Sequence, residues 1–207
     1  MQTLVQSEQP FDEIMPSPRP GLLGQLDRLI GPGATRAELL LQFLPAAAAA
    51  IAAPVYAMIA LPIQWTPLQL CLISLLGFDL VGGVLTNATS AAKRWYHRPG
   101  QGWQQHLAFV ALHVLHIGLV ALLFREADGI FFAGTSGYLL LATGAILTSP
   151  LYLQRPIALG LYALALLGDR YLFAPTPGLE WFLPLFFLKL FVSHLLDEMP
   201  YHPSNRR

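Results

Sequence analysis

The six histidines of this chain fall in three short stretches, each at or near the same end of an expected membrane helix. Acidic and amide side chains accompany them. The whole group comprises His97, His106, His113, His116, His194, His202, Asp79, Asn87, Asp197 and Glu198. Imidazole and carboxylate groups at membrane depth cost free energy, so they are rare there and usually face a bundle interior or a cavity. The sequence therefore predicts that this group binds or reacts with something.

Imidazole and carboxylate side chains at helical spacing are suited to holding metal ions. His106, His113 and His116 are separated by seven and then three residues, which places them within about 80° on one helical face. A helical His-x-x-His pair can direct two imidazoles at one metal or at two adjacent metals. The predicted metal ligands are His97, His106, His113, His116, His194, Asp197 and His202. Neutral imidazoles together with carboxylates suit Fe, Zn, Cu or Mn.

Four further side chains are predicted to take part in catalysis, namely Asp79, Asn87, Lys189 and Glu198. Asp79 and Lys189 both lie near the expected bilayer midplane, where pairing would lower the cost of burying either charge. Alternatively, Asp79 is a metal ligand or an acid/base, and Lys189 binds an anionic group of the substrate. Asn87 would orient a ligand or a bound water. Glu198 or His202 would complete the ligand shell or move protons.

The composition is that of a membrane protein. The 207 residues are 55% hydrophobic and 12% charged, with a mean hydropathy of +0.52, whereas soluble domains carry about 25% charged residues. The formal net charge of zero excludes a global basic field, so no nucleic-acid partner is expected. The single cysteine, Cys71, excludes an intrachain disulfide and any CxxC metal or redox motif.

Six segments are long and apolar enough to form membrane helices, which need about 20 residues to cross the hydrocarbon core. They are approximately residues 39–62, 67–90, 104–124, 129–150, 156–174 and 179–200. We therefore expect an all-α integral membrane protein with six transmembrane helices in a compact bundle.

The predicted domains are a cytoplasmic segment 1–37, a transmembrane domain 38–202 and a short cytoplasmic tail 203–207. The first segment has no continuous apolar region of the kind that marks a signal peptide. Residues 21–30 are expected to form either an interfacial helix or a tethered loop.

The distribution of basic residues predicts the orientation. With six spans both ends of the chain lie on one side, which carries nine lysines and arginines against two on the other. The nine are Arg19, Arg28, Arg36, Lys93, Arg94, Arg98, Arg155, Arg206 and Arg207, and the two are Arg125 and Arg170. Cytoplasmic loops carry the excess of Lys and Arg, so we expect both termini in the cytoplasm, in an inner membrane of the bacterial type.

The polar faces of the second, third and sixth spans converge if these spans are neighbours, which we assume because no such face belongs in lipid. The site would then be a cytoplasm-facing polar pocket walled by apolar helices, suited to a lipid-like or hydrophobic substrate. The leading interpretation is a membrane-embedded metalloenzyme with one or two iron ions. Iron with open coordination positions would activate O₂ for hydroxylation or desaturation, and a redox partner is a candidate source of electrons.

Two short strings carry a family resemblance. His113-Val-Leu-His116-Ile and His194-Leu-Leu-Asp197-Glu198 look similar to the histidine boxes of membrane fatty-acid desaturases and hydroxylases. Those families use more histidines, in HxxxH and HxxHH boxes, whereas this chain has acids where a box would have histidines, so we do not assign it to them. The general set of ligands also resembles that of ceramidase-type membrane hydrolases, although their HxxxH motif is missing.

Other functions use the same residues. In a zinc hydrolase of a lipid amide or ester, three ligands from His113, His116, His194 and Asp79 would hold an ion that lowers the pKa of bound water to about 7. A b-haem or quinone electron carrier could use His113 and His194 as axial ligands. A transporter would use Asp79, Lys189 and the histidines as a relay. A structural subunit would not require the polar group at all.

Overall fold

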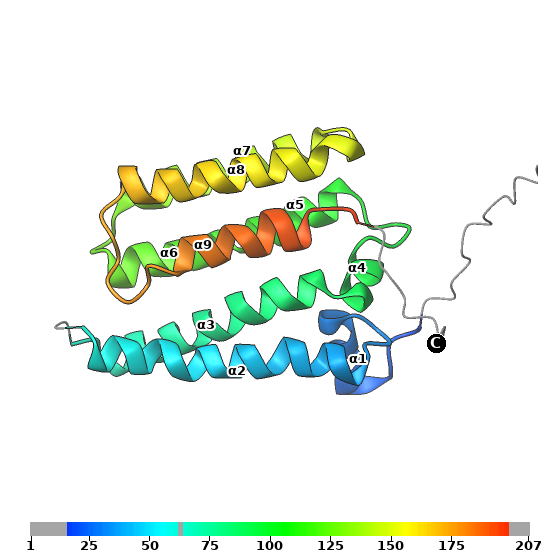
Figure 1. Ribbon diagram of the computed structural model, residues 1–207, viewed down its shortest axis with the longest axis horizontal. Helices are drawn as coiled ribbons and strands as arrows, with labels where there is room; N and C mark the ends of the chain where they lie inside the picture. The colour runs from blue at the N-terminus through cyan, green and yellow to red at the C-terminus, as the bar shows by residue number, and fades with distance from the viewer. Residues whose placement is uncertain (1–15, 62–63, 199–207) are drawn as a thin grey trace, which may run out of the picture.

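The computed structural model describes residues 16–61 and 64–198, and this part of the chain forms a bundle of helices without strands (Figure 1). The elements are α1 Gly21–Ile30, α2 Arg36–Ile59, α3 Pro67–Ala88, α4 Ser90–Tyr96, α5 Trp103–Leu112, α6 Val114–Phe124, α7 Gly129–Thr148, α8 Leu151–Leu172, α9 Phe182–Phe187 and the π-helix η1 Leu188–His194. The predicted His202 and the predicted tail 203–207 lie outside the described residues.

Five helices are long and apolar enough to cross a membrane, namely α2, α3, the combined segment Trp103–Phe124, α7 and α8. The sixth predicted span, 179–200, is observed as a shorter apolar helix, Phe182–His194. Its thirteen residues rise about 20 Å, less than the roughly 30 Å of a hydrocarbon core. The predicted span 179–200 would have placed His194 and Asp197 three residues apart on one helix, which is wrong, since Asp197 lies beyond the end of the observed helix.

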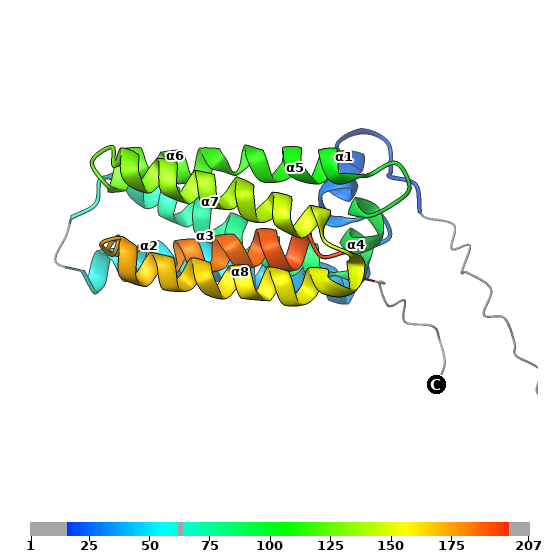
Figure 2. The same ribbon diagram turned by 90° about the horizontal axis from the view of Figure 1, so that it is seen from above.

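The short helix formed by α9 and η1 lies in the interior of the bundle. In Figure 1 it runs between α8 and α3, and Figure 2 shows it from above beside α8. Phe186, Leu190 and Phe191 are fully buried, and the ring of Phe187 lies 5.7 Å from that of Tyr138 on α7. Because protein rather than lipid covers this helix, its length is not set by the thickness of the bilayer.

Local sequence signals explain where the outer helices begin. Thr35 with Glu38 and Thr66 with Gln69 form capping boxes at the starts of α2 and α3, and Pro67 occupies the first turn of α3. The fifth span begins at Leu151 rather than at the predicted residue 156, because Pro156 lies inside α8. Prolines are tolerated in membrane helices where neighbouring groups satisfy the freed backbone.

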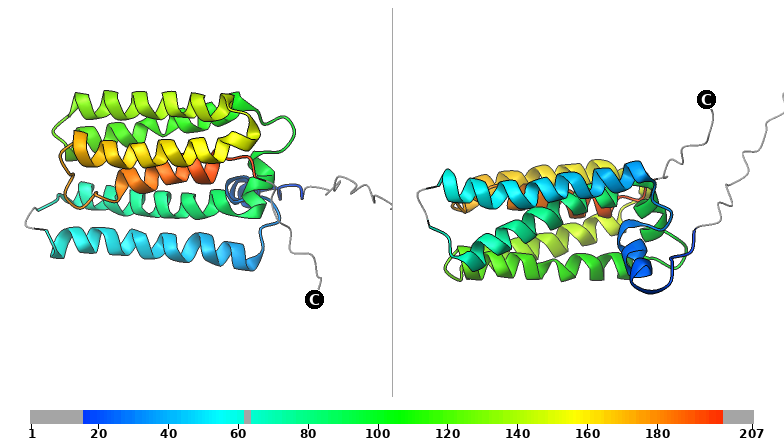
Figure 3. Two further views of the ribbon diagram at one scale, coloured as in Figure 1. Left: turned by 45° about the horizontal axis from the view of Figure 1, so that its top comes forward. Right: turned by 90° about the horizontal axis from the view of Figure 1, so that it is seen from below.

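The first and last described residues lie at the same end of the bundle, together with α1 and α4 (Figure 1). The loops that join α6 to α7 and α8 to α9 lie at the opposite end. Figure 3 shows α2 at the outer edge of the bundle, packed against α3. Of the nine basic residues predicted to lie on the cytoplasmic side, Arg206 and Arg207 lie outside the described residues. The other seven lie at the end of the bundle that holds α1 and α4, whereas Arg125 and Arg170 lie at the opposite end. Which end faces the cytoplasm stays a prediction.

Candidate functional site

A π-helical turn directs two polar side chains of the central helix, which α9 and η1 form together, toward α3. The Leu195 N–H donates to the carbonyl of Leu190, five residues back, at 3.0 Å. Residues five apart would diverge by about 140° on an α-helix, but the wider π turn brings Lys189 and His194 over each other. Lys189 Nζ donates to Asp79 Oδ2 at 2.7 Å, and His194 Nδ1 donates to Asn87 Oδ1 at 3.4 Å. Single π turns are frequent at functional sites.

Asp79, whose side chain is 42% exposed, is the centre of a charge cluster that includes the buried Lys189. Its Oδ2 atom accepts from Lys189 Nζ and lies 3.2 Å from His116 Nε2. Lys189 is only 3% exposed, so its charge needs the partner that Asp79 supplies. A Cβ atom on Gly83 would lie 2.7 Å from Lys189 Cδ and 3.0 Å from Nζ. The glycine thus makes the room in which the ion pair forms, and pairing is the alternative that the structure adopts for Asp79 and Lys189.

The third span is interrupted at His113. The N–H of His113 donates to Val110 at 2.9 Å, and that of His116 donates to His113 at 3.0 Å; both bonds have the shorter spacing of a 3₁₀ turn. The carbonyl of Phe109 instead accepts from His113 Nδ1 at 2.8 Å. His113 is therefore protonated on Nδ1, and its ring stacks on that of His116 at 5.0 Å.

A second imidazole cluster lies nearer the end of the bundle. Since the amide oxygen of Asn87 can only accept, His194 carries its proton on Nδ1, and His194 Nε2 accepts from His106 Nδ1 at 3.2 Å. His97 stacks on His106 at 4.6 Å and lies 3.0 Å, through Nε2, from the carbonyl of His194. Phe109 stacks on His194 at 4.0 Å. Residues of the second, third and sixth predicted spans thus meet in this cluster, together with His97 at the end of α4.

Asp197 and Glu198 hold the segment after the central helix in place through contacts with two basic side chains. Asp197 Oδ1 lies 3.7 Å from His97 Nδ1, and Glu198 accepts from Arg155 on α8 at 2.5 Å. Lys93 Nζ donates to the carbonyl of Leu196 at 2.5 Å. Burial lowers the pKa of Lys93 to about 8, against the opposing effect of Glu198 and Asp197. Burial also lowers the pKa of His97.

The predicted metal ligands are divided between the two clusters. Within residues 16–61 and 64–198, no three His, Cys, Asp or Glu side chains lie close enough together to hold one metal ion. One pair has suitable spacing, because His106 Nδ1 and His194 Nε2 are 3.2 Å apart. Two nitrogen ligands of a tetrahedral zinc lie about 3.3 Å apart, given a bond length of about 2.05 Å. A metal centre stays a prediction.

A cavity of about 330 Å³ adjoins the charge cluster. Its polar wall includes Asp79, Asn87, His113, His116 and Lys189. Its apolar wall is contributed by α1, α2, α3 and α5, through Leu29, Ile30, Phe43, Ala46, Phe78 and Phe109. The cavity therefore has the two-sided character that an amphiphilic molecule requires.

Gln42 is a lining residue that the sequence analysis missed. It is 1% exposed, and its Oε1 atom accepts from the Thr86 hydroxyl at 3.0 Å. Its Nε2 atom is buried and has no hydrogen-bond partner among the described residues. A signal was present, because Gln42 is the one polar side chain in the apolar stretch 39–55 of the sequence.

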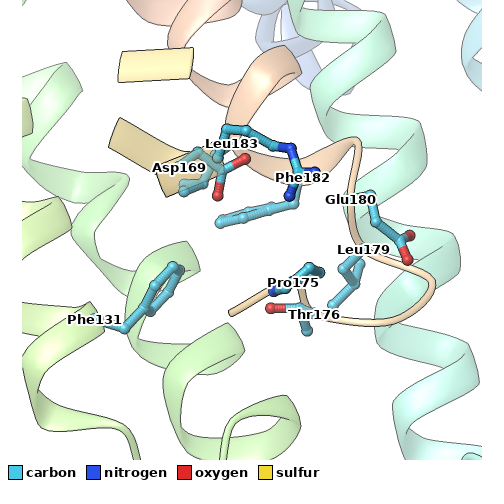
Figure 4. Close-up of a pocket in the computed structure, with 9 residues that line it drawn as sticks. Phe131, Asp169, Pro175, Thr176, Leu179, Glu180, Phe182 and Leu183 are labelled. Atoms are coloured by element: carbon cyan, nitrogen blue, oxygen red, sulfur yellow. The ribbon is translucent and has the colours of Figure 1, made fainter. Parts of the chain in front are cut away.

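A second cavity, of about 260 Å³, lies at the opposite end of the bundle (Figure 4). Figure 4 shows Asp169 and Glu180 on different sides of Phe182. Nearby, Arg125 donates to Asp128, Thr176 and the carbonyl of Ala174. No histidine lines this cavity, so it shares none of the predicted site.

Comparisons with protein families, with curated proteins and with solved structures found no match to this chain.

Proposed function

We propose that this chain is an integral membrane protein that binds a lipid-like molecule in the cavity beside Asp79, His116 and Lys189, and that these side chains perform acid–base chemistry on its polar group. The central helix would form a sixth, protein-covered crossing in addition to the five long helices. Both termini would lie in the cytoplasm, at a bacterial-type inner membrane. The excess of basic residues at the end of the bundle that holds both described ends supports this orientation.

One observation carries the proposal: buried polar nitrogen atoms without partners lie in residues that line a partly apolar cavity. Gln42 Nε2 and His116 Nδ1 have no hydrogen-bond partner among the described residues. Buried polar atoms are nearly always hydrogen-bonded, and leaving one unpaired costs about 1–3 kcal/mol. The oxygen of a bound head group would satisfy the amide of Gln42, while Phe43, Phe78 and Phe109 would contact an apolar chain.

The charge cluster is arranged for proton transfer. When His116 donates its Nε2 proton to Asp79, the lone pair remains on Nδ1, and a carboxylate that fixes the tautomer of an imidazole in this way is a feature of general bases. Lys189 lies 2.7 Å from the same carboxylate. Its positive charge would stabilise negative charge that develops on the substrate in this low-dielectric setting.

Binding of a fluorescent long-chain fatty acid to the purified chain in detergent tests the proposal. We expect saturable binding that Gln42→Leu weakens about tenfold, since one hydrogen bond in a buried site is worth about 1.4 kcal/mol. Asp169→Asn, which changes the second cavity, is the matched control and should bind as the unaltered chain does. Equal affinity of Gln42→Leu and the unaltered chain would contradict this placement of the ligand.

A metalloenzyme is the second candidate, favoured by the 3.2 Å spacing of His106 Nδ1 and His194 Nε2. His97, stacked on His106, and Asp197, close to His97, would have to move toward this pair to complete the shell, because no three such side chains of the described residues lie within reach of one ion. Iron would then support the oxidation of a lipid-like substrate, and zinc would support hydrolysis. In this candidate His106→Ala loses bound metal, measured by elemental mass spectrometry, while His113→Ala retains it. Equal metal content in both variants would overturn this assignment.

A further inference from the structure

The first helix, α1, presents a ridge of leucines that the bundle does not cover. Leu22 is 89% exposed, and Leu23 and Leu29 are also exposed. The opposite face, through Gly24, Asp27 and Ile30, is buried. An exposed apolar ridge of this kind on a ten-residue helix needs a partner, because exposed apolar patches mark interaction sites.

The position of α1 is fixed by contacts other than these leucines. Arg19 donates from both its backbone and its side chain to the Asp27 carboxylate, at 2.7–3.2 Å, and the hydroxyl of Tyr96 on α4 donates to the carbonyl of Leu29 at 2.9 Å. Gly31 has a φ of +89°, and a Cβ atom there would overlap the backbone between Ala91 and Ala92. The helix is therefore held firmly against α4, at the end of the bundle (Figure 3).

The surroundings of α1 point to lipid as its partner. The leucine ridge is followed in the chain by exposed leucines on the first turns of α2, namely Leu40, Leu41 and Leu44, which belong to a membrane-length helix. Arg28 is exposed on the polar side of α1, and Arg36, Arg94 and Arg98 lie at the same end of the bundle. Leucines beside arginines on a short amphipathic helix suit the boundary between acyl chains and anionic head groups.

The same helix borders the cavity. Leu29 and Ile30 of α1 line it together with Tyr96, and the cavity extends from them to Lys189. We propose that α1 lies in the lipid interface and forms one side of a lateral entrance, so that the amphiphile enters the cavity from the bilayer rather than from water. This inference rests on the proposed function, because it presumes that the cavity takes an amphiphile.

The placement of α1 is tested with a spin label on the full chain in vesicles of zwitterionic and anionic phospholipid, in a Cys71→Ser background. A label on Leu22→Cys should collide with oxygen dissolved in the bilayer and be shielded from a water-soluble nickel chelate. A label on Arg28→Cys, on the polar side of the helix, should be more accessible to the chelate. Equal accessibility of the two positions to the chelate would overturn the placement.

The entrance is tested by transfer of the fluorescent fatty acid from vesicles to the chain. Leu22→Asp should slow uptake from vesicles about tenfold, because it withdraws the helix from the interface, yet leave binding in detergent unchanged. Gln25→Asp is the charge-matched control on the polar side of α1 and should transfer normally. Normal transfer in Leu22→Asp would contradict the lateral entrance alone. Failure of the unaltered chain and of both variants to bind the fatty acid in detergent would contradict the proposed function.

Discussion

Replacing Gly83 with alanine should displace Lys189 from Asp79. The new Cβ atom would lie 2.7 Å from Lys189 Cδ and 3.0 Å from Nζ, which is closer than carbon and nitrogen atoms pack. The lysine is 3% exposed, and the open space next to it is the cavity that it lines. Overpacking of this kind costs about 1–3 kcal/mol, while alanine gains about 1 kcal/mol over glycine within a helix. We expect a net loss of about 0–2 kcal/mol in the free energy of unfolding, and a loss of about 1–3 kcal/mol relative to a glycine-to-alanine change that meets no neighbour.

The assay is reversible unfolding in one detergent, with Gly144→Ala as the control, because a Cβ atom at Gly144 meets nothing within 4 Å. The control should be neutral or stabilised. In a Lys189→Ala background the Gly83→Ala change should lose its penalty, because the Cδ and Nζ atoms that the new Cβ would meet are then absent. If Gly83→Ala proves as stable as Gly144→Ala, the glycine does not make room for the ion pair and this reasoning is refuted.

Three further predictions concern the surroundings of the cavity. Lys93 has a pKa of about 8 in the folded chain and 10.5 in the unfolded chain. Between these two pH values the unfolded chain binds more protons than the folded one, so the free energy of unfolding should rise from pH 8 to 10.5. Lys93→Met should abolish that rise in a series of denaturation measurements. Arg19 lowers the pKa of Asp27 to about 2, so the ion pair stabilises α1 above pH 4 and this stabilisation is lost as the pH falls through 2. Proteolysis near α1 should therefore stay slow at pH 5. An unchanged cleavage rate in Asp27→Asn would contradict this. Asn87→Leu removes the acceptor of His194 Nδ1 and should lower the free energy of unfolding by about 1–3 kcal/mol; a stability equal to that of the unaltered chain would show that this bond contributes nothing.

The sequence predicted the long helices well, because a run of about 20 apolar residues is what a helix needs to cross a hydrocarbon core. It also gave the pairing of Asp79 with Lys189 as one of two alternatives, since two opposite charges at one depth cost least when paired. It overestimated the central helix, because hydropathy measures apolarity and does not reveal whether lipid or protein covers a segment. The extension to residue 200 failed for this reason, and with it the pairing of His194 and Asp197 on one helix.

Features that depend on tertiary contacts could not be predicted. The break at His113 arises from an imidazole that bonds the Phe109 carbonyl, a choice that the spacing of the histidines does not show. The π turn that aligns Lys189 with His194 is likewise fixed by packing against α3. Gln42 could have been found, because a lone amide in an apolar span is costly unless it has a partner or a ligand.

The most direct test of the central claim is to map where a lipid-like molecule rests in the full chain. A photoreactive long-chain fatty acid, bearing a diazirine in its acyl chain, would be crosslinked in vesicles and the labelled peptides identified by mass spectrometry. We predict labelling of Phe43 on α2 and Phe78 on α3, and its loss in Gln42→Leu. Labelling confined to the second cavity near Phe182, or spread evenly over exposed leucines and unchanged in Gln42→Leu, would contradict the account.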